Sequence, residues 1–127
     1  MIPAPDQGRL RLGAALAAMA VATGAFGAHG LKTLVDASAL VTWETACRYH
    51  FYHSLGILIA AFLPSANARM ASRFFLAGII LFSGSLYALT FRNLVELPGI
   101  LGPITPVGGL CMIIGWLALL KKPASKT

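Results

Sequence analysis

The chain has 127 residues, of which 57% are hydrophobic and only 11% are charged, and its mean hydropathy is +0.77. Soluble domains have about 45–50% apolar and about 25% charged residues, and so short a chain cannot bury that much apolar surface. The net charge of +6 would suggest nucleic-acid binding in a soluble protein. Here the basic residues cluster at the ends of apolar segments, as topology signals do. We therefore expect a single transmembrane domain over residues 1–127, with the lipid bilayer as a partner and no nucleic acid.

The first apolar segment, residues 12–28, carries no charge and is rich in small residues. Small residues recur there at four-residue spacing in two rows, Ala14, Ala18, Ala22 and Ala20, Gly24, Ala28. Such rows let neighbouring helices approach closely, so they predict helix packing or self-association. The alternative is a cleaved signal peptide, with Arg9 and Arg11 as its basic region and Ala25–Gly27 as a small-x-small site.

Three further apolar segments complete the set, at about residues 42–63, 74–91 and 105–120. With the first, they give four spans of about 16 to 22 residues, which suit a bilayer core of about 30 Å at 1.5 Å rise per residue. In the last segment we expect Thr105 to be the N-cap and Pro106 the first helical residue. The sequence therefore predicts an all-α membrane protein, a bundle of four transmembrane helices.

The basic residues are distributed unevenly between the two ends of such a bundle. Seven of the ten fall on the side of the termini, namely Arg9, Arg11, Arg69, Arg73, Lys121, Lys122 and Lys126. The other three are Lys32, Arg48 and Arg92, and they share their side with Asp36, Glu44 and Glu96. By the positive-inside rule, both termini are expected to be cytoplasmic, in a multi-pass protein of the cell inner (plasma) membrane.

The stretch from Trp43 to Ser54, WETACRYHFYHS, places ionisable groups at the entrance to an apolar span. Such groups are costly in a membrane and need partners or water. Glu44 and Arg48 stand four residues apart with the acid first, which predicts an ion pair. Tyr49 and His53 share another helical face, and a neighbouring stripe consists of Trp43, Cys47, His50 and Ser54.

Several interpretations of these polar residues stay open. In the simplest, His29 and His53 hydrogen-bond across the bundle, Arg48 snorkels to the headgroups, and an interfacial aromatic belt is formed by Trp43, Tyr49 and Tyr52. A metal site would need His29 as a third ligand, because no single helical face gathers Glu44, His50 and His53. A proton relay through the histidines is a further option.

Other chemistry is not indicated by the residues. There is no serine nucleophile with a matching base, no glycine-rich phosphate loop and no pair of catalytic carboxylates. Cys47 and Cys111 lie in apolar segments without metal-binding spacing, so we expect buried free thiols. The hydroxyls of Ser83 and Ser85, in the middle of the third span, are expected to serve helix packing. We therefore predict no enzyme activity and no cofactor.

Four pieces of the sequence together resemble one family. They are GAFGAHGL from Gly24 to Leu31, the residues Trp43, Thr45, Ala46, Tyr49 and His53, the run FSGSLY from Phe82 to Tyr87, and TPVGG from Thr105 to Gly109 followed by Gly115 and Trp116. The chain is similar over nearly its whole length to the YgdD family of small membrane proteins, a domain of unknown function. The resemblance implies a four-span inner-membrane protein and no particular reaction. It favours His29 and His53 over His50, Arg48 and Cys47 as residues of interest.

The leading functional hypothesis is thus a structural or accessory membrane protein that associates with itself or with a larger membrane complex. The alternative is a small proton-coupled transporter or permease that uses His29 and His53. The candidate functional residues are His29, His53, Tyr49, Trp43, Ser83, Ser85, Tyr87 and Thr105.

Overall fold

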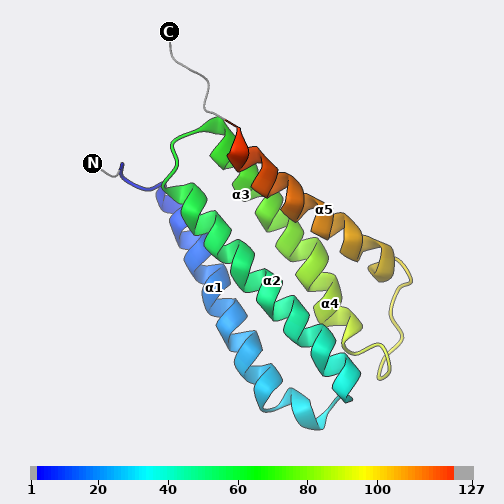
Figure 1. Cartoon of the computed structure of the whole chain (residues 1–127). Coiled ribbons are helices and arrows are strands. Elements are labelled where there is room, and N and C mark those ends of the chain that lie inside the picture. Colours follow the sequence, from blue (N-terminus) through cyan, green and yellow to red (C-terminus); the bar gives the residue numbers. More distant parts are fainter. Residues whose placement is uncertain (1–2, 122–127) are drawn as a thin grey trace.

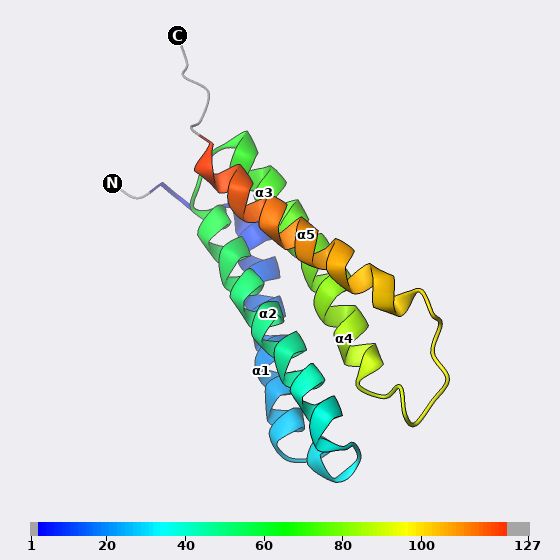
Figure 2. The same cartoon turned by 45° about the vertical axis from the view of Figure 1, so that its right-hand side comes forward.

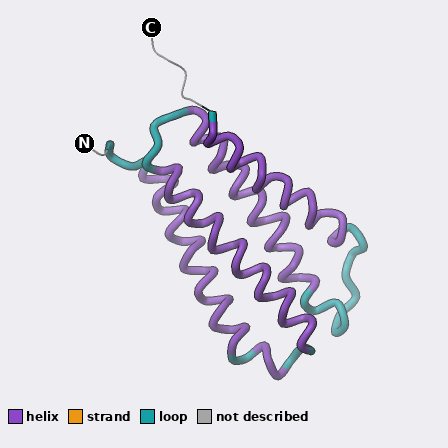
Figure 3. Tube along the Cα trace, viewed as in Figure 1, coloured by secondary structure: helices purple, strands orange, loops and turns teal. Residues whose placement is uncertain are grey.

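A computed structural model describes residues 3–121, and these form an all-helical bundle (Figures 1 and 3). Its elements are α1 (Gln7–Ala28), the 3-10 turn η1 (Leu31–Thr33), α2 (Ala37–Ala61), α3 (Ala66–Gly78), the π-helical turn η2 (Ile79–Ser83), α4 (Gly84–Leu89) and α5 (Leu101–Leu120). Through η2, α3 and α4 form one continuous rod. The bundle therefore consists of four helices, as the four apolar segments predict. Lys122 and Lys126 lie outside the described residues.

Three of these rods are long and apolar enough to cross a membrane, namely Gln7–Ala28, Ala66–Leu89 and Leu101–Leu120. The remaining rod, α2, is the longest helix, at 25 residues. Its middle part, residues 44–53, carries Glu44, Arg48, His50 and His53, and these polar residues lower its hydropathy. The helix that is not among these three apolar rods is thus the one that carries most of the ionisable side chains inside the bundle.

The described ends of the chain lie at the same end of the bundle (Figure 1). The backbone N–H of Asp6, just before α1, donates to the Ala61 carbonyl at the end of α2, at 2.7 Å. Asn67 Nδ2, at the start of α3, lies 3.5 Å from the Lys121 carbonyl after α5. Both contacts tie residues near a terminus to the α2–α3 connection.

Short polar side chains fix the starts of three helices. Asp6, Asp36 and Ser65 have extended backbones and accept the N–H of the residue three positions later. Each therefore satisfies one of the N–H groups that a helix leaves unpaired in its first turn.

The predicted start of the last helix is wrong. Thr105 is not an N-cap, because α5 begins at Leu101 and contains Pro106 in its interior. Pro103 lies in the first turn, where its missing N–H would be unpaired in any case. Thr105 is helical, and its hydroxyl donates to the Leu101 carbonyl at 3.1 Å.

The cap at Asp36 makes the stability of the bundle depend on pH. The N–H of Ala39 donates to Asp36 Oδ1 at 2.8 Å, and this bond lowers the pKa of Asp36 below its usual 3.8. A carboxylate with a lowered pKa stabilises the fold at neutral pH, and the contribution is lost as pH falls through the folded-state pKa.

The matched variant is Asp36→Asn, since asparagine caps equally well and does not titrate. We expect its thermal stability in detergent to equal that of the native chain near pH 6, and to fall less than the native chain's between pH 5 and pH 3. Asp6 is present in both proteins, so its own titration cancels. If both proteins lose the same thermal stability between pH 5 and pH 3, protonation of Asp36 is not coupled to unfolding.

Two glycines fourteen residues apart set the contact between α1 and α2. Gly13 and Gly27 are buried, and a Cβ on them would lie 2.8 Å from Leu58 and 2.6 Å from the Trp43 indole, respectively. The predicted four-residue rows are not the packing face within the chain, because Ala14, Ala18, Ala22 and Ala28 are exposed and only Ala20 is buried. Side-chain volume on α2, in Leu58 and Trp43, explains why glycine rather than alanine is needed at the contacts.

The contact of α5 with the α3–α4 rod uses the same device. Gly108 and Gly115 are buried on α5, and a Cβ on Gly115 would lie 2.6 Å from the Phe75 ring. Gly108 is closer still, because its Cβ would overlap the Phe82 backbone nitrogen in η2. The two peripheral helices therefore reach the two central rods through bare backbone, as in other close membrane helix pairs.

Candidate functional site

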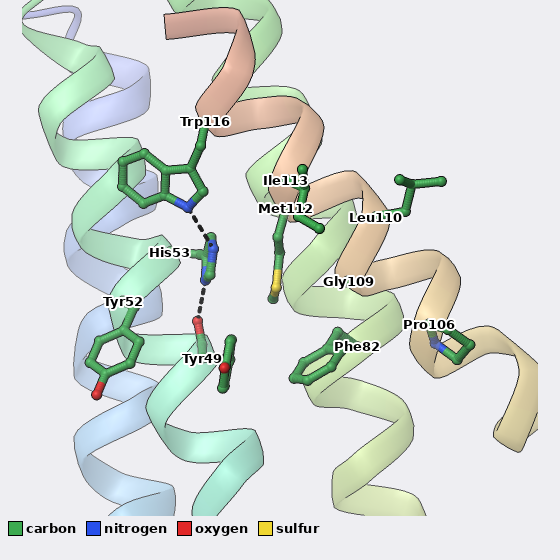
Figure 4. A pocket seen from close by; sticks show the side chains of 10 residues that line it. All are labelled: Tyr49, Tyr52, His53, Phe82, Pro106, Gly109, Leu110, Met112, Ile113 and Trp116. Carbon is green, nitrogen blue, oxygen red and sulfur yellow. Dashed lines mark hydrogen bonds between the residues drawn. The ribbon is translucent and has the colours of Figure 1, made fainter. Parts of the chain in front are cut away.

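A lateral cleft of about 930 Å³ opens between α2, η2 and α5. It is lined by Tyr49, Tyr52, His53, Phe82, Pro106, Gly109, Leu110, Met112, Ile113 and Trp116 (Figure 4). In Figure 2, α5 lies close to α3 near the chain ends and leans away from α4 toward the opposite end. Most of the lining is apolar, and this is the usual character of a ligand or partner site.

His53 stands in the wall of the cleft with both ring nitrogens bonded. Nδ1 lies 2.7 Å from the Tyr49 carbonyl oxygen, which can only accept, so Nδ1 carries the proton. Trp116 Nε1 donates to His53 Nε2 at 3.0 Å, so Nε2 is the acceptor. The ring is therefore a neutral imidazole in one tautomer, and Nε2 cannot take a proton without losing its bond to Trp116.

Aromatic packing holds His53 and Trp116 in these positions. The Phe75 ring is fully buried, and its centroid lies 5.5 Å from that of His53 and 4.6 Å from that of Trp116. Gly56 and Gly115 leave room for this ring, since a Cβ on either would lie within 3 Å of it. The wall of the cleft is thus a rigid element shared by three helices.

Tyr49 and Tyr52 form the rim of the cleft (Figure 4) and are 40% and 50% exposed. Tyr49 is the thirteenth residue of the 25 in α2, about 18 Å from either helix end at 1.5 Å rise per residue. The interfacial belt of Tyr49 and Tyr52 stays a prediction, and it would require the middle of α2 to lie near a membrane surface. Trp43 does not face the surroundings, because it is buried and its Nε1 donates to the Thr23 carbonyl at 2.8 Å.

A second polar cluster joins α1, α2 and α4 inside the bundle. The Tyr87 hydroxyl lies 2.9 Å from His50 Nδ1 and 3.0 Å from Thr23 Oγ1. Cys47 Sγ lies 3.5 Å from the same threonine hydroxyl and 3.7 Å from Tyr87. Such bonds between helices stabilise membrane bundles, so the cluster cross-links three helices that the glycine contacts bring together.

His50 has one nitrogen left over in this cluster. The residue is only 3% exposed, and within residues 3–121 its Nε2 is buried without a hydrogen-bond partner. An unpaired polar atom in such a place is destabilising unless something outside the chain satisfies it.

Sequence reasoning missed the importance of His50, which the family resemblance ranks below His29 and His53. A signal was present, because His50 shares a helical stripe with Trp43, Cys47 and Ser54, and this stripe is the face that α2 turns into the bundle.

The serines predicted to serve packing are both buried. Ser85 Oγ donates to the Phe82 carbonyl at 2.9 Å and lies 2.5 Å from Thr105 Oγ1, so it links α4 to α5. Ser83 Oγ, within residues 3–121, is buried without a partner. Ser85 Oγ therefore lies within hydrogen-bond distance both of a carbonyl of its own rod and of the Thr105 hydroxyl on α5.

His29 is separate from the other candidate residues. It is the exposed C-cap of α1, and its Nδ1 lies 3.0 Å from the Ala25 carbonyl of its own helix. His53 is sixteen residues beyond the first residue of α2, about 24 Å along the helix from the end where His29 lies. His29 and His53 therefore do not meet. The predicted bond across the bundle is confirmed for His53, which bonds to Trp116 on α5, and is wrong for His29, which bonds within its own helix.

The predicted ion pair in α2 is also wrong. Within residues 3–121 the ion pair that the structure contains joins Arg9 to Asp6, whereas Arg48 Nη2 lies 3.5 Å from Thr45 Oγ1. Arg48 and Glu44 are both exposed, so neither needs the other to offset burial. Among the described residues, no three His, Cys, Asp or Glu side chains gather closely enough to hold a metal ion.

Comparison with known proteins places this architecture in a family. Residues 23–109 match the model of a family described as "Protein of unknown function (DUF423)". The chain is 46% identical over 112 residues to UPF0382 membrane protein SAB0533 of Staphylococcus aureus (strain bovine RF122 / ET3-1), covering 86% of this chain and 88% of the relative. It is 43% identical over 114 residues to UPF0382 membrane protein YwdK of Bacillus subtilis (strain 168), covering 86% and 89%. A UPF0382 membrane protein of Haemophilus influenzae is 41% identical over 102 residues, covering 78% and 79%.

No solved structure gives a significant match. The family description names no enzyme activity. The predicted resemblance to a family of small membrane proteins of unknown function is confirmed. The name YgdD does not occur among these matches, so that part of the resemblance stays a prediction. The chain belongs to the DUF423 family, whose UPF0382 members are membrane proteins.

Proposed function

We propose that all four rods cross the plasma membrane of a bacterial cell and that both termini are cytoplasmic. The support for a fourth span is that α2, about 36 Å long, packs along α1 and against the α3–α4 rod. The support for the orientation is that the described end of the bundle where α1 begins and α5 ends carries Arg9, Arg11, Arg69, Arg73 and Lys121.

In this membrane the protein has a structural or accessory role, without catalysis, in a larger membrane complex. One observation carries this proposal: the wall of the large apolar cleft has no free histidine nitrogen, because both ring nitrogens of His53 are bonded within the chain. A catalytic or proton-carrying histidine needs a free nitrogen in at least one state. What the cleft offers instead is apolar surface and two exposed tyrosines at its rim.

The surface suits one kind of partner, a transmembrane helix of another protein that places large apolar side chains between α2 and α5. Tyr52, Ile113 and Leu110 are all at least half exposed along this cleft, and lipid alone would fill it in the absence of a partner. Tyrosine at such a rim contributes both contact area and a hydroxyl that can bond a partner's backbone or side chain.

Photocrosslinking in native membranes tests this role. We expect benzoylphenylalanine at Tyr52 or at Ile113 to capture one and the same membrane protein, identified by mass spectrometry. The matched position is Val21, which is 64% exposed but lies on α1, outside the cleft. Adducts from Val21 alone would move the association to α1, and purely lipid adducts from Tyr52 and Ile113 would overturn the accessory role of the cleft.

A further inference from the structure

We propose that a cavity at the chain-end side of the bundle binds the phosphate of an anionic phospholipid. The cavity has a volume of about 250 Å³ and lies between α1 and α3. It is lined by Asp6, Arg9, Leu12, Arg69, Ser72, Arg73 and Leu76. Three arginines against one aspartate leave a net charge of +2 on its lining, which attracts an anion.

Arg9 is held in place before any ligand arrives. Its Nη1 donates to the Ala60 carbonyl at 2.6 Å, and its Nε lies 3.6 Å from Asp6 Oδ1. These contacts leave Nη2 of the guanidinium fork for a further acceptor. A fixed donor loses less entropy on binding than a mobile one.

Arg69 and Arg73 are the two uncompensated charges of the cavity. They stand four residues apart on one face of α3, and within residues 3–121 neither forms an ion pair with an acidic side chain. Like charges at this spacing repel each other, so an anion between them removes an unfavourable interaction. Guanidinium groups bind phosphate oxygens in a bidentate manner.

The apolar part of the lining distinguishes a lipid from free phosphate. On α1, Leu12 follows Arg9 by three residues, and on α3, Leu76 follows Arg73 by three residues. Both leucines therefore lie about one helical turn deeper in the bundle than the arginines, and both are partly buried against the core. If a lipid headgroup lies at the arginines, its acyl chains run along the two leucines into the hydrocarbon layer. Basic pockets between membrane helices bind the headgroups of anionic lipids.

Lipid titration of the delipidated full-length protein, followed by native mass spectrometry, tests this site. We expect phosphatidylglycerol to bind on the order of tenfold more tightly than phosphatidylcholine, and the double variant Arg69→Gln/Arg73→Gln to lose this preference. The control is Arg11→Gln/Lys121→Gln, which removes the same charge from exposed positions at the same end, outside the cavity. It should keep the preference.

Two further measurements separate the alternatives. Inorganic phosphate at millimolar concentration should compete poorly, because it makes no contact with Leu12 and Leu76; full competition would assign the site to free phosphate and overturn the lipid. Equal loss of preference in both double variants would show general attraction to a basic end and would also overturn the site. The thermal stability of each variant is measured in the same detergent. If Arg69→Gln/Arg73→Gln does not fold, the test uses Leu12→Ala/Leu76→Ala, which keeps every charge and should weaken phosphatidylglycerol binding.

Discussion

Replacing Gly108 with alanine is expected to separate α5 from the α3–α4 rod. A Cβ at this position would overlap the Phe82 backbone nitrogen and lie 2.7 Å from the Leu81 carbonyl carbon. Backbone atoms cannot move aside as the end of a flexible side chain does, so the two helices must move apart. Overpacking typically costs about 1–3 kcal/mol, and we expect this variant to lose about 3 kcal/mol or more, since Ser85 and Thr105 would also be pulled apart.

The neighbouring residue provides the control. A Cβ on Gly109 would lie 3.6 Å from the Phe82 ring, an ordinary van der Waals distance. Because alanine is favoured over glycine in a helix by about 1 kcal/mol, Gly109→Ala should be neutral or slightly stabilising. Unfolding by denaturing detergent in mixed micelles measures both variants, and a Gly108→Ala protein as stable as Gly109→Ala would contradict the backbone contact.

Trp116→Phe is expected to destabilise the bundle chiefly through His53. Phenylalanine keeps an aromatic ring beside Phe75 but removes the N–H that satisfies His53 Nε2. His53 is only 5% exposed, so its acceptor would be left unpaired, at a cost of about 1–3 kcal/mol. The same unfolding experiment measures this loss.

A double-mutant cycle attributes the loss to the hydrogen bond. In Trp116→Phe/His53→Leu both polar partners are absent, so the double variant should be more stable than the sum of the single effects predicts. Nitrogen-15 shifts of the histidine rings in the native chain should also show His53 protonated at Nδ1. Strict additivity, or a proton at Nε2, would contradict the tautomer that the structure requires.

The helices could be predicted from the sequence because apolar segments and the basic residues beside them are local features of the chain. The last helix shows the limit, since Pro106 was expected to begin α5 and instead lies inside it. A proline late in a second turn is costly in an isolated helix, but here the contacts of Thr105 and Gly108 with the α3–α4 rod hold the helix before and after it. Packing between helices thus outweighed a local signal.

The polar partners could not be predicted from one helix at a time. The spacing in α2 correctly grouped Trp43, His50 and Ser54 on one face, yet it gave no information about which helix that face would meet. Tyr87 and Trp116, the side chains that bond to the two buried histidines, come from α4 and α5. Spacing within the helix also favoured an ion pair between Glu44 and Arg48, which exposure to the surroundings makes unnecessary.

The number of residues in the π-helical turn η2, Ile79–Ser83, determines which way the side chains of α4 point. A π turn accommodates one residue more than an α-helical turn does, and each residue rotates the following side chains by about 100°. Without that additional residue, Ser85 would turn away from Thr105 and Tyr87 away from His50 at the same time. The links from α4 to α5 and to α2 therefore both depend on η2. Deletion of a single residue within η2 would break both links, although Thr105 and His50 would be unchanged.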